Sequence, residues 1–124
     1  MALIAESRFR YPDEEHPDWT TRSNVPNHSS GIPHDPETAY PDLVVLNSKM
    51  EVVKIIEIES KRNLSVDDVN RWKTYTSLCP AFYLYVPLET RSKVIQVLNF
   101  HRIPYKMLGL YAYNSQGHLL VDND

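Results

Sequence analysis

Proline is concentrated at the start of this 124-residue chain: six of its nine prolines lie at or before residue 41. Proline fixes φ and lacks a backbone N–H donor, so this stretch cannot form a long helix or a central strand. It also lacks helical or strand periodicity. We therefore expect residues 1–41 to form an extended proline-rich N-terminal arm and residues 42–124 to form one α/β domain.

After residue 41 the apolar pattern changes and predicts seven regular elements. The expected strands cover residues 43–46, 52–61, 81–86, 107–113 and 118–121, and the expected helices cover residues 65–78 and 90–102. Ser65 followed by Asp68 is typical of a capping box, and Pro80 ends that helix. The first two strands form an antiparallel hairpin, and the strand–helix–strand units predict parallel strands. The fold class is α/β: a small mixed sheet flanked by helices, in the order ββαβαββ.

Charged residues end the most hydrophobic of these strands. Glu57, Glu59 and Lys61 alternate there, so they share a face, with successive side chains about 6.5–7 Å apart. Asp42 begins the neighbouring strand. Carboxylates this close repel one another unless something neutralises them, and oxygen ligands suit Mg²⁺ or Mn²⁺. We therefore expect Asp42, Glu57 and Glu59 to bind a divalent cation.

Two hairpin registers bring Asp42 to this cluster. The first matches apolar residues on one face, pairing Val44 with Ile55 and Leu46 with Val53. It places Asp42 opposite Glu57, whereas a shift by two residues places Asp42 opposite Glu59. An exposed edge strand would carry the same charges without any function. Apolar residues on both faces earlier in the strand favour a central position instead.

The pattern resembles a known family. Pro41-Asp42, followed by Glu59-Ser60-Lys61 after a hydrophobic strand, resembles the PD-(D/E)xK, or restriction-endonuclease-like, nuclease superfamily. Arg71 and Tyr75 on the following helix are similar to the Gln-x-x-x-Tyr element of its helicase-associated branch, with Arg in place of Gln. The resemblance covers residues 41–121. A second alignment is equally open, in which Glu57 takes the acid position and Glu59 replaces the lysine.

This resemblance implies a restriction-endonuclease-like core and hydrolysis of phosphodiester bonds with Mg²⁺ or Mn²⁺, in DNA rather than RNA. Asp42 and Glu59 would hold the metal, and Lys61 would orient the attacking water or stabilise developing charge. The family's first helix often supplies one more acid, for which Glu6 and Glu37 are the candidates here.

The same resemblance suggests residues that contact the substrate and an alternative function. Arg71, Lys73 and Tyr75 could contact the phosphate backbone, although an ordinary exposed helix face would look the same in sequence. A catalytically inactive member of the fold, acting as a binding or regulatory subunit, is the alternative function. A plain α/β interaction domain, with a fortuitous acidic cluster, is a third.

Charge and cysteine content set the remaining expectations. The net charge is −3, yet residues 62–106 carry seven basic and three acidic side chains, so the downstream half is mildly basic. Cys79 is the single cysteine, and the five histidines lack zinc-ligand spacing. We expect a cytoplasmic protein without membrane segments. A homodimer could form by exchange of the arm or by pairing of edge strands.

Overall fold

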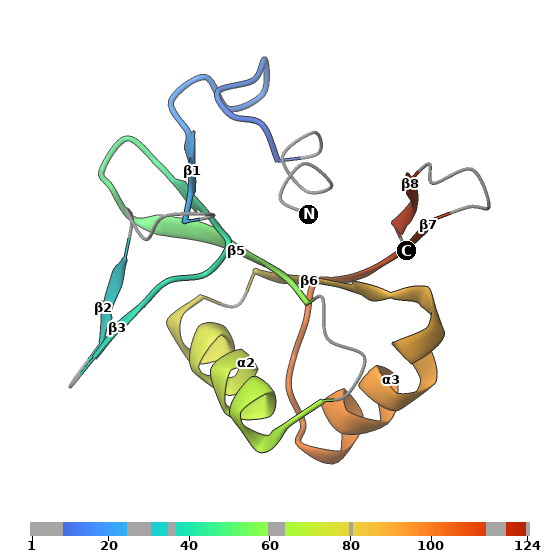
Figure 1. Ribbon diagram of the computed structural model, residues 1–124. Coiled ribbons are helices and arrows are strands. Elements are labelled where there is room, and N and C mark those ends of the chain that lie inside the picture. The colour runs from blue at the N-terminus through green and yellow to red at the C-terminus, as the bar shows by residue number, and fades with distance from the viewer. Residues whose placement is uncertain are drawn as a thin grey trace.

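A six-stranded mixed sheet organises the chain (Figure 1). The computed structural model describes residues 9–24, 31–34, 37–59, 64–79, 81–113 and 119–123. Its strands are β1 (Thr20–Ser23), β2 (Ile32–His34), β3 (Glu37–Ala39), β4 (Leu43–Leu46), β5 (Val52–Ile58), β6 (Phe82–Pro87), β7 (Met107–Tyr113) and β8 (Leu119–Asn123). Its helices are α2 (Val66–Leu78), the 3₁₀ turn η1 (Leu88–Thr90) and α3 (Arg91–Phe100).

The strand order in the main sheet is β1-β4-β5-β6-β7-β8. From β4 onward the elements follow the predicted ββαβαββ order, and β5, β6 and β7 are parallel as expected. Strand β5 lies between β4 and β6, which confirms its predicted central position. The fold class is therefore confirmed as a small mixed α/β sheet with two helices among the described residues.

The arm upstream of residue 41 contains three short strands that we did not predict. Strand β1 pairs antiparallel with β4 at the edge of the main sheet, and β2 and β3 form a separate two-stranded hairpin. An edge position tolerates Pro33 within β2, because an edge strand needs hydrogen bonds on one side only. The arm is thus attached to the domain along the β1–β4 ladder.

Helices α2 and α3 cover the same face of the sheet (Figure 1). Both connect parallel strands in steps of the same direction, from β5 to β6 and from β6 to β7, and right-handed crossovers of this kind place successive helices on one side. Trp72 of α2 and Leu98 of α3 pack in one core cluster with Leu84 of β6. Neither of these two helices is long and apolar enough to cross a membrane.

Residues 9–24, which we call the N-terminal strap, cover the opposite face (Figure 1). Phe9 is buried there in a second core cluster with Ile56 of β5 and with Tyr83 and Tyr85 of β6. The rings of Phe9 and Tyr83 meet edge to face at a centroid distance of 4.8 Å. One face of the sheet is therefore covered by helices and the other by the strap.

The β4–β5 hairpin has the first of the two expected registers, with one local difference. Val44 pairs with Ile55 as predicted, but Leu46 pairs with Val52 instead of Val53. The predicted Leu46–Val53 pair is wrong because the ladder is irregular at this point, consistent with a β-bulge that leaves Val53 as an extra residue.

Helix α2 begins as the sequence predicts. Ser65 is its N-cap: the Asp68 N–H donates to Ser65 Oγ at 3.3 Å, and the Ser65 N–H donates to Asp68 Oδ2 at 2.9 Å. The helix ends at Leu78 with Cys79 as its C-cap. Pro80, which we expected to end the helix, lies outside the described residues.

Candidate functional site

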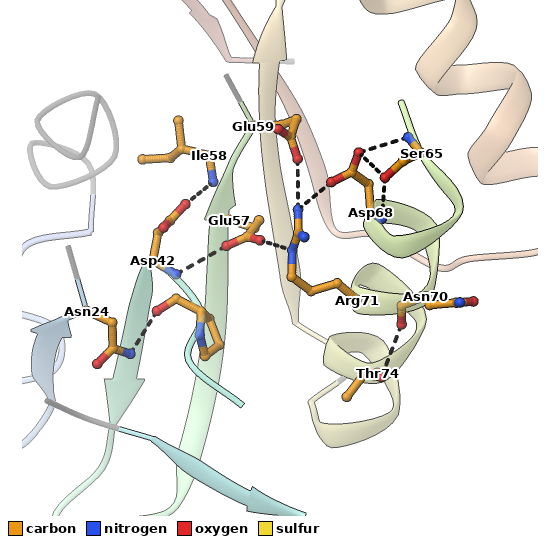
Figure 2. Close-up of polar contacts among 11 residues, drawn as sticks. Asn24, Asp42, Glu57, Ile58, Glu59, Ser65, Asp68, Asn70, Arg71 and Thr74 are labelled. Atoms are coloured by element: carbon orange, nitrogen blue, oxygen red, sulfur yellow. Dashed lines mark hydrogen bonds and ion pairs between the residues drawn. The ribbon is translucent and has the colours of Figure 1, made fainter. Parts of the chain in front are cut away.

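Asp42 and Glu57 lie side by side at the open end of the β4–β5 hairpin, opposite its turn (Figure 2). The Asp42 backbone N–H donates to Glu57 Oε1 at 3.2 Å, and Asp42 Oδ2 accepts a hydrogen bond from the Ile58 N–H at 2.7 Å. Glu57 is only 5% exposed, whereas Asp42 is half-buried. Two carboxylates from antiparallel strands therefore share one end of the hairpin.

Arg71 of α2 supplies positive charge to this region (Figure 2). Its Nε donates to Glu57 Oε2 at 2.7 Å, and one terminal nitrogen donates to Glu59 Oε2 at 2.9 Å and to Asp68 Oδ1 at 3.0 Å. About a third of its side chain, 34%, stays exposed. Glu57 and Glu59 thus point to the same face, as the strand alternation predicted.

Arg71 and the acids Asp42, Glu57, Glu59 and Asp68 form a group that we call the acidic network. Asp68 is the member of this network that we did not predict. Its side chain is fully buried and accepts hydrogen bonds from the Ser65 N–H, the Ser65 hydroxyl and Arg71. We recognised Asp68 only as a capping residue. The spacing of three residues to Arg71 was a sequence signal that could have connected the two.

The pKa values of the two buried acids Glu57 and Asp68 are shifted in opposite directions. Burial, and next the neighbouring Asp42 carboxylate, raise the pKa of Glu57 to about 8, although Arg71 acts to lower it. Burial alone would raise the pKa of Asp68. The hydrogen bonds from Ser65 and Arg71 outweigh that effect and lower the Asp68 pKa to about 2. Asp68 is therefore held as a carboxylate, whereas Glu57 takes up a proton near neutral pH.

The three residues predicted on the α2 surface have three different environments. Arg71 is tied into the acidic network, and Lys73 is exposed. Tyr75 is only 4% exposed, with its ring 6.2 Å from that of Phe82. Burial, followed by the charge of Glu57, raises the pKa of the Tyr75 hydroxyl. Tyr75 therefore packs in the core, and its expected contact with substrate stays a prediction.

Several predicted candidates cannot be located. Lys61 and Glu6 lie outside the described residues, and the same is true of the Glu37 side chain. Over the described ranges, the structure contains no group of three or more His, Cys, Asp or Glu residues arranged to hold a metal ion. The expected set of Asp42, Glu57 and Glu59 is instead divided, since Arg71 bridges Glu57 and Glu59.

The donors that are present nevertheless suit a divalent cation. Mg²⁺ is commonly held by one or two carboxylates, with water and substrate phosphates completing its coordination. Asp42 and Glu57 offer two carboxyl groups with hard oxygen ligands, and a cation would offset the part of the raised Glu57 pKa that comes, after burial, from the Asp42 charge. The chemistry of this pair fits Mg²⁺ or Mn²⁺.

Comparison of the chain with models of known protein families, with curated proteins and with solved structures finds no match. The residues of the acidic network and their geometry are therefore the basis on which a function can be proposed.

Proposed function

We propose that this protein is a divalent-metal-dependent phosphodiesterase with a restriction-endonuclease-like core, acting on DNA. The observation that carries the proposal is the pairing of Asp42 with Glu57 at one end of a central strand, beside Glu59 and Asp68. Arg71 contacts three of these carboxyl groups, those of Glu57, Glu59 and Asp68, and Asp42 adjoins Glu57.

Asp42 differs from the other three acids in its relation to Arg71. Arg71 reaches Glu57, Glu59 and Asp68, and no contact of Arg71 with Asp42 is recorded among the hydrogen bonds of the described residues. Burial, and next the charge of the Asp42 carboxylate, raise the pKa of Glu57, so ionising both groups is costly unless a cation compensates them. A divalent cation held by this pair is what we infer for the working protein.

The residues then have distinct roles. Asp42 and Glu57 hold the ion, which when bound lowers the pKa of a water ligand and polarises the scissile phosphate. Arg71 fixes the orientation of Glu57 and Glu59, and the exposed third of its side chain can donate to a phosphate oxygen. Lys73, exposed on the same helix, can contact the phosphate backbone.

The observed register bears on the two motif alignments. Because Asp42 lies beside Glu57, the alignment that reads Glu57-x-Glu59 as the acidic motif has the closer support. In the other alignment, Glu59-x-Lys61, the lysine is required for cleavage. Replacement of Lys61 therefore separates the alignments: Lys61→Ala should abolish cleavage if the motif is Glu59-x-Lys61 and should leave cleavage intact if the motif is Glu57-x-Glu59.

Nicking of supercoiled plasmid in the presence of Mg²⁺ or Mn²⁺ tests the activity. We expect the wild-type protein to nick DNA and Glu57→Gln, which keeps the shape but removes the charge, to reach only the background without protein. Glu15→Gln is the matched control, because Glu15 is an exposed acid of the strap. Equal cleavage by the wild-type protein and Glu57→Gln would overturn the assignment of Glu57.

Thermal melting tests the metal separately from catalysis. A cation that binds only the folded state stabilises it by RT ln(1 + [L]/Kd), about 2.7 kcal/mol at a hundredfold excess over Kd. We expect Mn²⁺ to raise the Tm of the wild-type protein and to leave the Tm of Asp42→Asn unchanged. An identical rise in both proteins would place the ion elsewhere.

One observation favours a second candidate function, a catalytically inactive nuclease-like fold that binds nucleic acid. Arg71 already contacts Glu57 and Glu59 and so acts as an internal cation in the network. If the protein retards DNA in a gel but shows neither nicking nor a metal-dependent rise in Tm, this second function is the correct one.

A further inference from the structure

Asn24, the last residue of the strap, is hydrogen-bonded to both residues that lead into β4. Figure 2 shows the bond made by its side chain. Its side-chain Nδ2 donates to the Pro41 carbonyl oxygen at 2.8 Å, and its backbone N–H donates to the Asp42 carbonyl oxygen at 2.9 Å. Asn24 is 2% exposed. Because Asn24 is buried, removal of its side chain would leave the Pro41 carbonyl without this hydrogen bond in a place that water does not readily reach.

The two hydrogen bonds from Asn24 lie just beyond the end of the β1–β4 pairing. The β1–β4 ladder ends with the pair Ser23–Leu43, and β4 itself begins at Leu43. Asp42 therefore lies one residue before the strand. The bonds from Asn24 continue the attachment past the end of the ladder and fix the backbone from which the Asp42 side chain projects.

The strap that carries Asn24 is itself fastened around a cation. The Lys54 ammonium of β5 lies 5.3–5.6 Å from the ring centroids of four aromatic residues, Phe9, Tyr11, Trp19 and Tyr83. It also donates to the Tyr11 hydroxyl at 2.9 Å. Three of these rings belong to the strap, so cation–π attraction and this hydrogen bond hold the strap on β5.

We propose that Asn24 is a positioning residue for Asp42, held at the site by the strap that packs around Lys54. The meaning of this role for catalysis rests on the proposed function, but the positioning itself can be measured without metal or substrate. In Asn24→Ala the side-chain bond to the Pro41 carbonyl is lost while the backbone bond to the Asp42 carbonyl remains. The segment before β4 then keeps one of its two bonds to the strap, and we expect the bond from the Ile58 N–H to Asp42 Oδ2 to weaken.

Hydrogen exchange of two adjacent amides provides a direct readout. The Ile58 N–H depends on Asp42, whereas the next amide, that of Glu59, donates to the Tyr85 carbonyl of β6 at 2.8 Å. In Asn24→Ala we expect the Ile58 amide to exchange about tenfold faster relative to the Glu59 amide, because the hydrogen bond from the Ile58 N–H to Asp42 Oδ2 is weakened. A general loss of stability would speed both amides and leave their ratio unchanged.

Metal affinity provides the second readout. Residues that orient a metal ligand typically change affinity by about 10- to 100-fold when removed, so we expect the Kd for Mn²⁺ to rise by that factor in Asn24→Ala. Asn47→Ala is the matched control. Asn47 accepts backbone hydrogen bonds from Lys49 and Glu51 at the far end of β4, so its loss should change neither the exchange ratio nor the Kd.

A further variant covers the case in which Asn24→Ala does not fold. Lys54→Met leaves Asn24 intact but removes the cation that fastens the strap, and we expect it to raise the Ile58-to-Glu59 exchange ratio as well. An unchanged ratio in a folded Asn24→Ala protein, or in Lys54→Met if that variant alone folds, would overturn the positioning role. A raised ratio in a protein that binds no Mn²⁺ even as wild type would support the positioning role and overturn the proposed metal function.

Discussion

At the scale of single residues, Arg71 shows how one side chain can serve three acids. A guanidinium presents several N–H donors in a rigid planar fork, whereas a lysine ammonium is a point charge on a flexible stem. Arg71 uses this geometry to reach Glu57 and Glu59 on β5 and Asp68 on its own helix. It therefore joins α2 to the central strand as well as balancing charge.

We expect Arg71→Met to lower the free energy of unfolding by about 3 kcal/mol, because removal of one partner leaves buried carboxylates without compensation. The value lies at the lower end for buried pairs, since about a third of the Arg71 side chain is in solvent. Urea denaturation at pH 7 measures it. Lys73→Met, an exposed position on the same helix, is the control, and equal stability of the two variants would contradict the expectation.

The acidic residues of the site were predictable, but their counter-ion was not. Alternation along β5 and the apolar pairing with β4 are enough to place Glu57 and Glu59 on one face and Asp42 beside Glu57. The direction of a long side chain such as Arg71 depends on how α2 packs against the sheet, which no local pattern specifies. Asn24 escaped prediction for a similar reason, because its contacts join segments 17 residues apart.

At the scale of elements, the start of α2 is coupled to the site through Asp68, which belongs to both the capping box and the Arg71 network. Ser65→Ala should therefore destabilise the protein by about 1 kcal/mol, as is usual for loss of an N-cap hydroxyl. Thermal or urea unfolding measures the change. Ser77→Ala, near the exposed end of the same helix, should have little effect, and a similar loss in both variants would argue against a special role for the cap.

The contact between β6 and β7 requires a residue without a side chain. A Cβ at Gly109 would lie 2.4 Å from the ring of Tyr85, its partner in the parallel ladder. We expect Gly109→Ala to cost about 1–3 kcal/mol of stability, as overpacking does in other cores. The double variant Tyr85→Leu, Gly109→Ala should lose less than the sum of the two single variants, and strict additivity would contradict the steric explanation.

Element order was largely predictable downstream of residue 41 because each helix and strand there carries its own period and its own end signal. Ser65 and the apolar stripe of α3 are examples. The three strands upstream had no such signal. β1 is four residues long and the other two are three residues each, and β1 owes its place to the exposed edge of β4 rather than to its own pattern.

At the scale of the whole molecule, the pKa of Glu57 makes stability depend on pH. The folded protein keeps a proton on Glu57 up to about pH 8, whereas the unfolded chain releases it near pH 4.5, the ordinary pKa of a glutamic acid side chain. Between these values the folded state binds more protons than the unfolded state, so stability falls as pH rises. One pKa unit corresponds to about 1.4 kcal/mol, and the full change should amount to a few kcal/mol.

Urea unfolding between pH 5 and pH 8, with EDTA present, measures this dependence. We expect Glu57→Gln to flatten the slope and Glu15→Gln to leave it unchanged. Asp68 acts in the opposite sense: its lowered pKa of about 2 stabilises the protein above pH 4, and that contribution is lost as the pH falls toward 2. A slope that persists in Glu57→Gln would assign the pH dependence to another group.

Strand β5 serves both faces of the sheet within a few residues. Lys54 meets the aromatic rings of the strap on one side, and Glu57 meets Arg71 on the other. Side chains on a strand change sides at every residue, so inserting or deleting a single residue between these two positions would turn one of them away from its partners. Evolution of this segment is thus constrained in its length more strictly than in its individual apolar residues, and homologous sequences should tolerate exchanges among Val, Ile and Leu here but no gaps.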